Sequence, residues 1–519
     1  MFTEALWQQW SKHELSNYST IGGLHKYLKK GYTHFDHRFW FPERNDELKK
    51  ILQNGLKVKN KATGKPEFWP FSPFLKVLIK TPRYRYQEIE GFYDLETKVR
   101  PICFASHIDS LIFSFYAYCL TKTYEDYIHS QGFADSILAY RSDLGNSNIQ
   151  FSKEIFEDIR KRGKCSAVAL DIKGYFDHID HSLLREKWLK ILGSRIMPED
   201  QFRLYKVLTH YSYVNKTSIY KEFRPIRKRS GTEPRTLLDL IPGKMNSEKF
   251  RVIREKRLVV VNEVPDAETG RFKGVPQGSA MSALLSNIYL IDFDKMMYDK
   301  AAKENFVYKR YCDDILIVGD TERANELQDY AISKIQEDYF QTIQKKKVEV
   351  IDFHLDSKAR FRAFKRHKND LSQAVATSIG NEQRFYKPLQ YLGFEFNGQD
   401  IFIRSSSLSR YFRKMRARIV KTVSMSYSPK SRSKRIFKKQ IFERYTHLGK
   451  RNFLTYAAKA SAERYQNSEK VWKQGMNSPA IKRQISRHLS ILMHNLDSKS
   501  EQRFQYKESK GKGDGRRII

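Results

Sequence analysis

Two acidic sites far apart in the chain carry the first chemical signal. Asp171 ends the apolar run "KCSAVALDI" (164–172), and Asp313 and Asp314 lie at the polar centre of "FVYKRYCDDILIVG" (306–319). If this strand and this hairpin are neighbours in one sheet, their carboxylates meet at one edge, where their repulsion favours bound cations. Two Mg²⁺ ions in such a cluster would activate a hydroxyl nucleophile and stabilise a departing pyrophosphate. The alternative, an acidic turn, fits poorly between two apolar half-strands of a basic protein.

The elements around these acids alternate between strands and helices. Hydrophobic periodicity predicts a buried strand at 164–172 and a hairpin at 306–319, which must position the acids. The other expected elements are helices over most of 1–90 and at 107–128, 181–192, 282–304 and 324–340, a loop at 59–70, hairpins at 83–106 (turned near Asp94), 257–275 (turned at "PDAETG") and 390–404, and basic helices after 405. This order predicts an α+β core followed by a helical region.

The charge of the chain indicates a polyanionic partner. The 519 residues carry a net charge of +36, and residues 401–519 contain 30 Lys/Arg against 7 Asp/Glu. A solubilising surface charge would not be concentrated in this way, and the basic residues are mixed with aromatic ones rather than set opposite an apolar face, which argues against a membrane partner. Four scattered cysteines argue against a zinc module or a disulfide framework. With no signal-like or membrane-spanning segment, we expect an intracellular, cytoplasmic protein.

Several motifs, in order, resemble those of reverse transcriptases. "ALDIKGYFDHIDH" (169–181), "GVPQGSAMSALLSNIYL" (274–290) and "YCDDILIVG" (311–319) are similar to palm motifs A, B and C. The segments similar to motifs D and E and to the fingers motifs are "QKKKVEV" (344–350), "YLGFEF" (391–396), "KVRPICFASHID" (98–109) and "ILAYRSDLGNSN" (137–148). The resemblance spans roughly 98–396. It implies an RNA-directed DNA polymerase, a nucleotidyltransferase that makes cDNA from dNTPs on an RNA template.

The resemblance also implies a right-hand polymerase fold. We expect an N-terminal extension and fingers over 1–163 and a palm with an antiparallel sheet and helices over 164–404. A basic insertion falls at about 214–270. A helical, basic thumb and RNA-binding region would follow over 405–500. The basic tail at 501–519 is expected to be disordered.

Residue roles follow from the matched motifs. Asp171 and Asp313, with the carbonyl of Ile172 and a weaker contribution from Asp314, would hold two Mg²⁺ ions, for which Mn²⁺ is a substitute. The expected nucleotide-binding residues are Lys98, Arg100, Phe176, Gln277, Gly278 and Lys347, and the expected primer-grip residues are Tyr391, Leu392 and Gly393. Phe176 matches the steric gate against a ribose 2′-hydroxyl, although a core aromatic is the alternative. Lys347 could protonate the pyrophosphate, although a triple lysine run is often a solvated turn. Arg141 is either a nucleotide contact or part of a surface salt bridge.

A narrower resemblance points to bacterial defence-associated (abortive-infection and unknown-group) reverse transcriptases. It rests on "HFDHRFWF" (34–41), "RPICFASHIDS" (100–110), "ILAYRSD" (137–143) and "YTHLGKRNFLTYAAKAS" (445–461). It implies anti-phage activity with a cognate structured non-coding RNA as template, and it leaves homo-oligomerisation open. Aromatic residues of the basic region, such as Tyr411 and Phe412, could stack on bases or form helix core. The alternatives are a group II intron maturase, an RNA-dependent RNA polymerase, which Phe176 disfavours, and a catalytically dead RNA-binding scaffold, which the retained acids disfavour.

Overall fold

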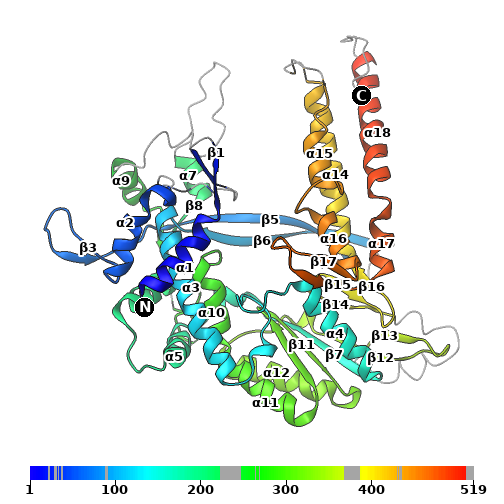
Figure 1. Ribbon diagram of the computed structural model, residues 1–519, viewed down its shortest axis with the longest axis horizontal. Helices are drawn as coiled ribbons and strands as arrows, with labels where there is room; N and C mark the ends of the chain where they lie inside the picture. The colour runs from blue at the N-terminus through cyan, green and yellow to red at the C-terminus, as the bar shows by residue number, and fades with distance from the viewer. Residues whose placement is uncertain are drawn as a thin grey trace. The chain divides into compact units, whose positions relative to one another are not determined.

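In the computed structural model, the chain forms two compact units. Figure 1 draws it with colour running from blue at the N-terminus to red at the C-terminus. The structure describes residues 1–21, 24–27, 32, 34, 36, 39–87, 92–222, 247–263, 265–267, 269–366, 386–428, 431 and 435–509. The first unit is Met1–Asp143, Leu170–Ile315 and Asp329–Lys347, and the second is Leu144–Ala169, Leu316–Gln328 and Val348–Ile519. No helix of the described residues is both long and apolar enough to cross a membrane.

The first unit begins with helices that pack through aromatic side chains. They are α1 (Glu4–Leu15), α2 (Phe41–Gln53) and α3 (His107–Ser130). Trp10 of α1 meets Phe41 and Phe115 edge-on, with ring centroids 5.4 and 5.6 Å apart. Such pairs add to the stabilisation that burial of the rings provides. The helix predicted at 107–128 is confirmed as α3, and the side chain of Ser106 caps its start by accepting from Asp109 N.

The expectation that residues 1–90 are mainly helical is wrong in part. Short strands follow α1 and α2, and the stretch predicted as a loop at 59–70 contains part of a hairpin. In this hairpin Asn60 holds the turn, because its side chain accepts a hydrogen bond from Ala62 N at 2.8 Å. Strands of three or four residues are too short to show a period of two, which explains the error. The strands are β1 (Tyr18–Ile21), β2 (Leu24–Tyr27), β3 (Lys57–Lys59) and β4 (Pro66–Phe68).

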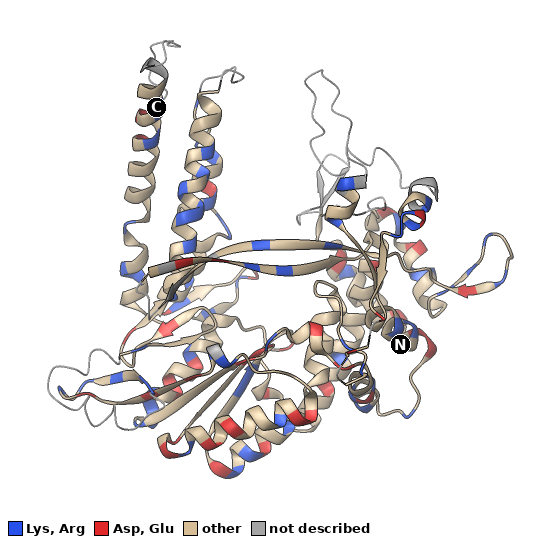
Figure 2. Ribbon diagram, turned by 180° about the vertical axis from the view of Figure 1, so that it is seen from behind, with Lys and Arg blue, Asp and Glu red and all other residues tan. Residues whose placement is uncertain are grey.

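A long two-stranded ribbon of β5 (Phe74–Gln87) and β6 (Phe92–Phe104) dominates the next part of this unit (Figure 1). Lys and Arg residues lie along both of its strands (Figure 2). The predicted turn near Asp94 is wrong, because Asp94 lies inside β6 opposite Arg85. The link between the two strands, residues 88–91, lies outside the described residues. The prediction relied on Asp being common in turns, but an exposed ribbon also tolerates Asp within a strand.

The ribbon belongs to a four-stranded sheet of order β6-β5-β8-β9, with β8 (Ser212–Asn215) and β9 (Val259–Val261). The predicted hairpin at 257–275 is therefore wrong, since β9 pairs with β8. The "PDAETG" segment still turns, with Asp266 N donating to Arg271 O at 2.9 Å. The apolar run at 259–261 extends an existing sheet edge instead. Much of the predicted basic insertion, residues 223–246, lies outside the described residues.

A five-stranded sheet of order β10-β11-β7-β12-β13 carries the predicted palm strands. The strand predicted at 164–172 and the hairpin predicted at 306–319 are confirmed as β7 (Cys165–Asp171) and as β10 (Val307–Tyr311) with β11 (Asp314–Gly319). The other two strands are β12 (Glu349–Leu355) and β13 (Phe361–Lys365). The middle residues of β7 are buried, as expected for a strand inside a sheet.

The helices predicted near these strands are confirmed with one exception. Helix α5 (His181–Leu192) matches its predicted bounds, and α12 (Ala324–Tyr339) matches them within one residue. The single helix predicted at 282–304 is instead two, α10 (Ala280–Tyr289) and α11 (Ile291–Glu304). The break falls at Leu290, whose φ of −98° and ψ of 16° are not helical. Continuous hydrophobic periodicity hides such a break, because both helices remain buried on one face.

The second unit contains α4 (Asn148–Arg162), the three-stranded sheet β14-β15-β16 and the C-terminal helices. The sheet strands are Leu389–Tyr391, Phe394–Phe396 and Ile401–Ile403, as the predicted hairpin requires. The helices are α14 (Ser405–Ser426), α15 (Lys439–Tyr445), α16 (Phe453–Ser461), α17 (Pro479–Ser486) and α18 (His488–Ser509). A hairpin of β17 (Arg464–Gln466) and β18 (Trp472–Gln474), which the sequence did not predict, interrupts them.

Apolar side chains hold the C-terminal helices together. Met415 and Ile419 of α14 form a core with Leu492 and Leu496 of α18, and Phe504 packs against it. This packing explains why α18 runs through residue 509, into the tail predicted to be disordered; residues 510–519 lie outside the described residues. Helix-core packing also describes the two aromatics named as candidates for base stacking, Tyr411 and Phe412, of which Tyr411 lies against Tyr445.

Candidate active site

The end of β7 and the turn between β10 and β11 bring two of the predicted acids together. Ile172 N donates to Asp313 O at 3.1 Å, so the backbones that carry Asp171 and Asp313 are hydrogen-bonded neighbours. Cys312 adopts a φ of +59°, which reverses the chain tightly at the turn. Burial, together with the negative charge of Asp171, raises the pKa of the Asp313 carboxyl. A cation between the two carboxylates would relieve this repulsion.

A buried ion pair supports the turn from behind. Arg310 Nε donates to Asp294 Oδ1 at 2.7 Å, and both side chains are fully buried. Arg310 Nη1 also donates to the carbonyl of Cys312 at 3.0 Å, and Tyr308 Oη donates to Asp294 at 2.7 Å. Sequence reasoning missed this pair. The signal was the alternation of β10, in which Tyr308 and Arg310 point to the same buried face.

Lys347 reaches the acidic site. Its Nζ lies 2.6 Å from Asp171 Oδ1, so the positive charge at this carboxylate in the structure is the ammonium group of the Lys347 side chain. The backbone fixes this approach, since Gln344 N donates to Asp171 O at 2.9 Å and Lys347 N donates to Gln344 O at 2.7 Å. The structure therefore brings Lys347, out of the triple lysine run, to the predicted catalytic carboxylates.

The predicted metal ligands are assembled only in part. Asp314 begins β11 with an exposed side chain, and among the described residues no three His, Cys, Asp or Glu side chains form a group that could hold a metal. The carboxylates of Asp171 and Asp313 remain as neighbouring oxygen donors, and Ile172 contributes the backbone N–H that joins their two segments. Hard divalent cations prefer such oxygen ligands, so this donor set fits a divalent metal ion.

The segment 274–279 packs against the loop after Asp171. Val275 N donates to the carbonyl of Phe176 at 2.9 Å, so Phe176 is tied to this turn with its ring half-buried. On the other side, Cys103 N of β6 donates to Gln277 O at 2.8 Å. Gly278 has a φ of +119°, and a Cβ there would lie 2.8 Å from Cys103 O. Glycine is therefore required by both conformation and space.

The predicted fingers residues lie on the strand that the turn touches. Lys98, Arg100 and Ile102 are spaced by two residues and so share one face of β6. Their partners on β5 are Thr81, Ile79 and Val77, in that order. The side chain of Ile102 is within 3.0 Å of the Cβ position of Gly278, which places Lys98 and Arg100 on the same strand face as that contact.

Two other sets of candidates have structural roles of their own. The side chain of Arg141 is fully buried, forms an ion pair with Asp143 and donates to the carbonyl of Ile137 at 3.1 Å. It is therefore held in a salt bridge, but in a buried one rather than the surface one expected. In the second unit, Leu392 and Gly393 form the turn between β14 and β15 with φ values of +43° and +95°. Tyr391 is buried beside that turn, and the Leu392 carbonyl accepts from Asn148 at 3.3 Å.

Comparison with known proteins agrees with these motifs. The family model described as reverse transcriptase (RNA-dependent DNA polymerase) matches residues 96–396, more than half of the chain. No curated protein matches the sequence.

Similar solved structures include telomerases of two yeasts. An apo telomerase of Candida tropicalis, truncated from its C-terminal domain, is 10% identical with a TM-score of 0.36, covering 70% of this chain and 59% of that one. The telomerase of Candida albicans in complex with the TWJ fragment of telomeric RNA is 14% identical with a TM-score of 0.34, covering 91% and 65%. The chain thus spans less than two thirds of either protein, and these scores are too low to support an argument about function.

Proposed function

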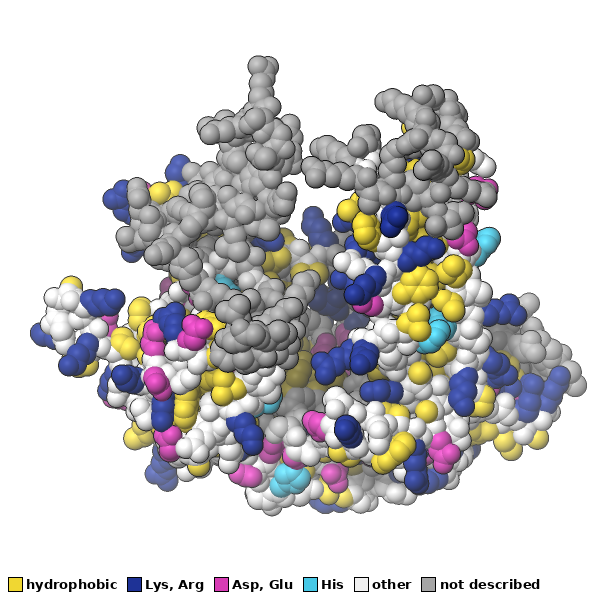
Figure 3. Space-filling model, turned by 45° about the horizontal axis from the view of Figure 1, so that its top comes forward, with side chains coloured by type: hydrophobic (Ala, Val, Ile, Leu, Met, Phe, Trp, Pro, Cys, Tyr) yellow, Lys and Arg dark blue, Asp and Glu magenta, His cyan; other side chains and the backbone are white. Residues whose placement is uncertain are grey.

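Because the chain belongs to the reverse transcriptase (RNA-dependent DNA polymerase) family, we propose that it synthesises cDNA from dNTPs on an RNA template. Membership of this family means that the protein is a nucleotidyltransferase and that it has the α+β fold of right-hand polymerases. Enzymes of this family generally use divalent metal ions. The observation that carries the proposal is the juxtaposition of Asp171, Asp313 and Lys347 at one edge. The excess of basic residues, which are spread over the face seen in Figure 3, suits a nucleic-acid partner.

Each proposed role belongs to a residue at a described position. Asp171 and Asp313 would hold Mg²⁺, with Mn²⁺ as a substitute and Asp314 as an accessory, and the bound metal would supply Lewis-acid chemistry to the attacking 3′-hydroxyl and the phosphates. Lys347, already at Asp171, donates a proton to the departing pyrophosphate. Two further groups act on the nucleotide: Lys98, Arg100, Gln277 and Gly278 bind it, and the Phe176 ring excludes the ribose 2′-hydroxyl. Tyr391, Leu392 and Gly393 hold the primer end.

The two-carboxylate site is tested with Asp313→Ala. We expect this variant to lose Mg²⁺-dependent dNTP incorporation on a primed RNA template by at least about a thousandfold, because one of two metal-holding carboxylates is removed. RNA binding, measured by filter retention, should stay unchanged. Asp126→Ala, on the exposed face of α3, is the matched control and should keep full activity. Full activity of Asp313→Ala would exclude the assignment.

We propose further that the template is a cognate structured non-coding RNA and that the cDNA acts in anti-phage defence. The support is the sequence resemblance of 34–41, 100–110, 137–143 and 445–461 to defence-associated reverse transcriptases. The test is to purify the protein from its native host, sequence the co-purifying RNA, and sequence the DNA made when dNTPs are added. One structured RNA that also templates the DNA is the expected result. An intron RNA would favour the maturase alternative, and the absence of an enriched RNA would contradict a cognate template.

A further inference from the structure

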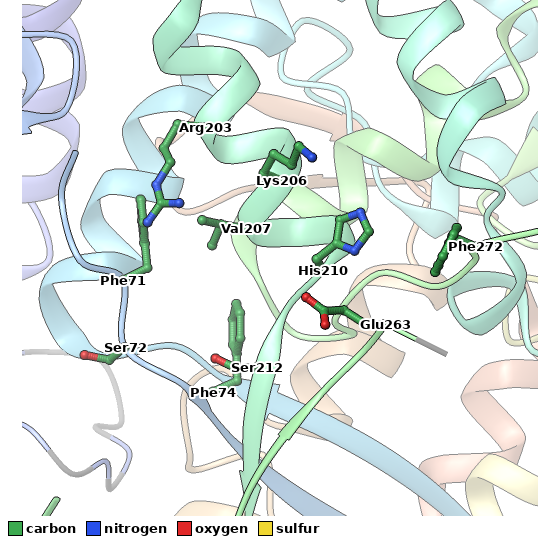
Figure 4. Close-up of a pocket in the computed structure, with 10 residues that line it drawn as sticks. All are labelled: Phe71, Ser72, Phe74, Arg203, Lys206, Val207, His210, Ser212, Glu263 and Phe272. Carbon is green, nitrogen blue, oxygen red and sulfur yellow. The ribbon is translucent and has the colours of Figure 1, made fainter. Parts of the chain in front are cut away.

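A pocket of about 590 Å³ lies in the first unit, apart from the carboxylate site (Figure 4). Its walls are the chain before β5, the helix α6 (Glu199–Thr209), the start of β8 and the segment around Glu263. None of the residues proposed above for catalysis or nucleotide binding lines it. The lining residues that matter for its chemistry are Phe71, Phe74, Arg203, Lys206, His210 and Glu263.

The aromatic wall is rigid. Phe71 and Phe74 both stack on the buried ring of Phe113, with centroids 5.2 and 5.9 Å apart. The chain around them is fixed by the buried carboxylate of Asp109, which accepts from Ser72 N at 2.9 Å and from the Trp69 indole at 2.8 Å. Phe113 covers one face of the Phe71 ring, and the Arg203 guanidinium lies over the ring at 5.8 Å from its centroid. A flat ligand would therefore pack against this guanidinium and the exposed edge of the ring.

The basic wall has unused hydrogen-bonding capacity. Arg203 Nη2 donates to Trp69 O at 3.3 Å, but its buried Nε has no partner among the described residues. Among the residues that the structure describes, neither Arg203 nor Lys206, one turn further along α6, forms an ion pair with an acidic side chain. Burial lowers the pKa of Arg203, which means that its charge is poorly solvated. An anion at this wall would supply the missing partner.

Glu263 gives the pocket an acceptor as well. Figure 4 shows its carboxylate and the ring of Phe74 turned toward the middle of the pocket, and the guanidinium of Arg203 beside Phe71. A ligand suited to all three walls has a flat ring, an anionic group and N–H donors. Purine and cytosine nucleotides combine these features through the amino groups of their bases. The one N–H donor of uracil lies between two carbonyl oxygens, which repel a carboxylate.

We propose that this pocket binds a single nucleotide, with its base against Phe71, its phosphate on Arg203 and Lys206, and a base N–H donor on Glu263. The nucleotide is either free or part of an RNA strand. The site is connected to the turn that carries Gln277 and Gly278, because Asn262 Nδ2, beside Glu263, donates to Lys273 O at 3.1 Å. Occupancy would therefore stabilise the base of that turn. This site does not depend on the proposed polymerase activity.

The test measures binding of GMP, AMP, CMP, UMP and inorganic phosphate by calorimetry in EDTA, which removes divalent metal ions. Asp313→Ala protein is used so that the carboxylate site does not contribute. We expect saturable binding with UMP weakest and phosphate alone weaker still. Lys206→Ala should weaken GMP binding about tenfold, since it loses a charge-assisted contact. Lys303→Ala, an exposed lysine of α11, should not.

Glu263→Gln separates the base contact from the phosphate contact. This variant should reduce the preference for GMP over UMP while leaving the affinity for phosphate and the melting temperature of the protein unchanged. Competition with a short single-stranded RNA then identifies the source, since displacement of GMP indicates an RNA-strand site and no displacement a free-nucleotide site. The proposal is overturned if no nucleotide binds at millimolar concentration, if phosphate binds as tightly as GMP, or if Lys206→Ala binds GMP like the parent protein.

Discussion

At the scale of single residues, the catalytic turn depends on an ion pair that lies behind it. Replacing Asp294 by Ala leaves the guanidinium of Arg310 buried without its counter-charge. We expect this change to lower the free energy of unfolding by about 3–5 kcal/mol, as broken buried pairs do. It should also reduce polymerase activity, because Arg310 no longer holds the Cys312 carbonyl in place. Urea unfolding and dNTP incorporation measure the two effects.

The neighbouring pair Lys295–Asp299 is the control for that prediction. It lies on the same helix, α11, but its side chains are 35% and 46% exposed. Asp299→Ala should cost less than about 1 kcal/mol and leave activity unchanged, because water screens exposed ion pairs. Equal losses of stability in the two variants would contradict the role assigned to burial.

Phe176 carries the second prediction at this scale. Phe176→Ala should lower the preference for dNTPs over rNTPs, measured as the ratio of kcat/KM, by at least about tenfold, or 1.4 kcal/mol. The reason is that the ring proposed to exclude the 2′-hydroxyl is removed. Phe68→Ala, a partly exposed aromatic of β4, should leave the ratio unchanged. An unaltered ratio in Phe176→Ala would favour the core-aromatic alternative.

The sequence predicts some of these residues better than others. Asp171 and Asp313 follow from short local patterns, namely an apolar strand that ends in an acid and a hairpin with an acidic centre. Their approach, through Ile172 N and Asp313 O, agrees with that expectation. Arg310 and Asp294 were not predicted, because their roles arise only when α11 packs on β10. Lys347 could not be distinguished from its neighbouring lysines until the backbone at Gln344 was positioned.

At the scale of elements, the turn at 274–279 gives a prediction on steric fit. Gly278→Ala combines a positive φ with a Cβ 2.8 Å from Cys103 O. Gly193 also has a positive φ, of +60°, in the left-handed helical region, but a Cβ there meets nothing within 4 Å. We expect Gly193→Ala to cost about 1 kcal/mol from conformation alone. Gly278→Ala should cost more and raise the KM for dNTPs, because the turn must move away from β6.

Thermal unfolding and steady-state kinetics of both variants test this contrast. Equal losses of stability, with an unchanged KM for Gly278→Ala, would show that the turn can shift without affecting the nucleotide site.

The sequence predicts some helices and strands better than others. Strong periodicity predicted α5 and α12 correctly, whereas the break at Leu290 and the pairing of β9 with β8 depend on tertiary contacts that no local pattern encodes.

At the scale of the whole molecule, the cysteines report on the integrity of both units. All four are buried. Burial raises the pKa of the Cys103 thiol to about 11 and those of the other three, Cys119, Cys165 and Cys312, to about 12. The unfolded chain releases these protons near pH 8.5, whereas the folded chain keeps them. The stabilisation is therefore complete below about pH 8.5 and is lost as the pH rises toward 12, so the free energy of unfolding should fall across that range.

The same burial predicts the reactivity of the thiols. At pH 8.5 about half of each thiol is ionised in the unfolded chain, but about 1 in 300 or fewer is ionised in the folded one, and thiolate is the reactive form. Titration with a disulfide reagent should therefore detect no fast-reacting thiol in the native protein and four in 6 M guanidinium chloride. One fast thiol in the native state would show local opening of the unit that contains it. Reaction of single-cysteine variants would then assign that opening to Cys165 in the second unit or to one of the three cysteines in the first.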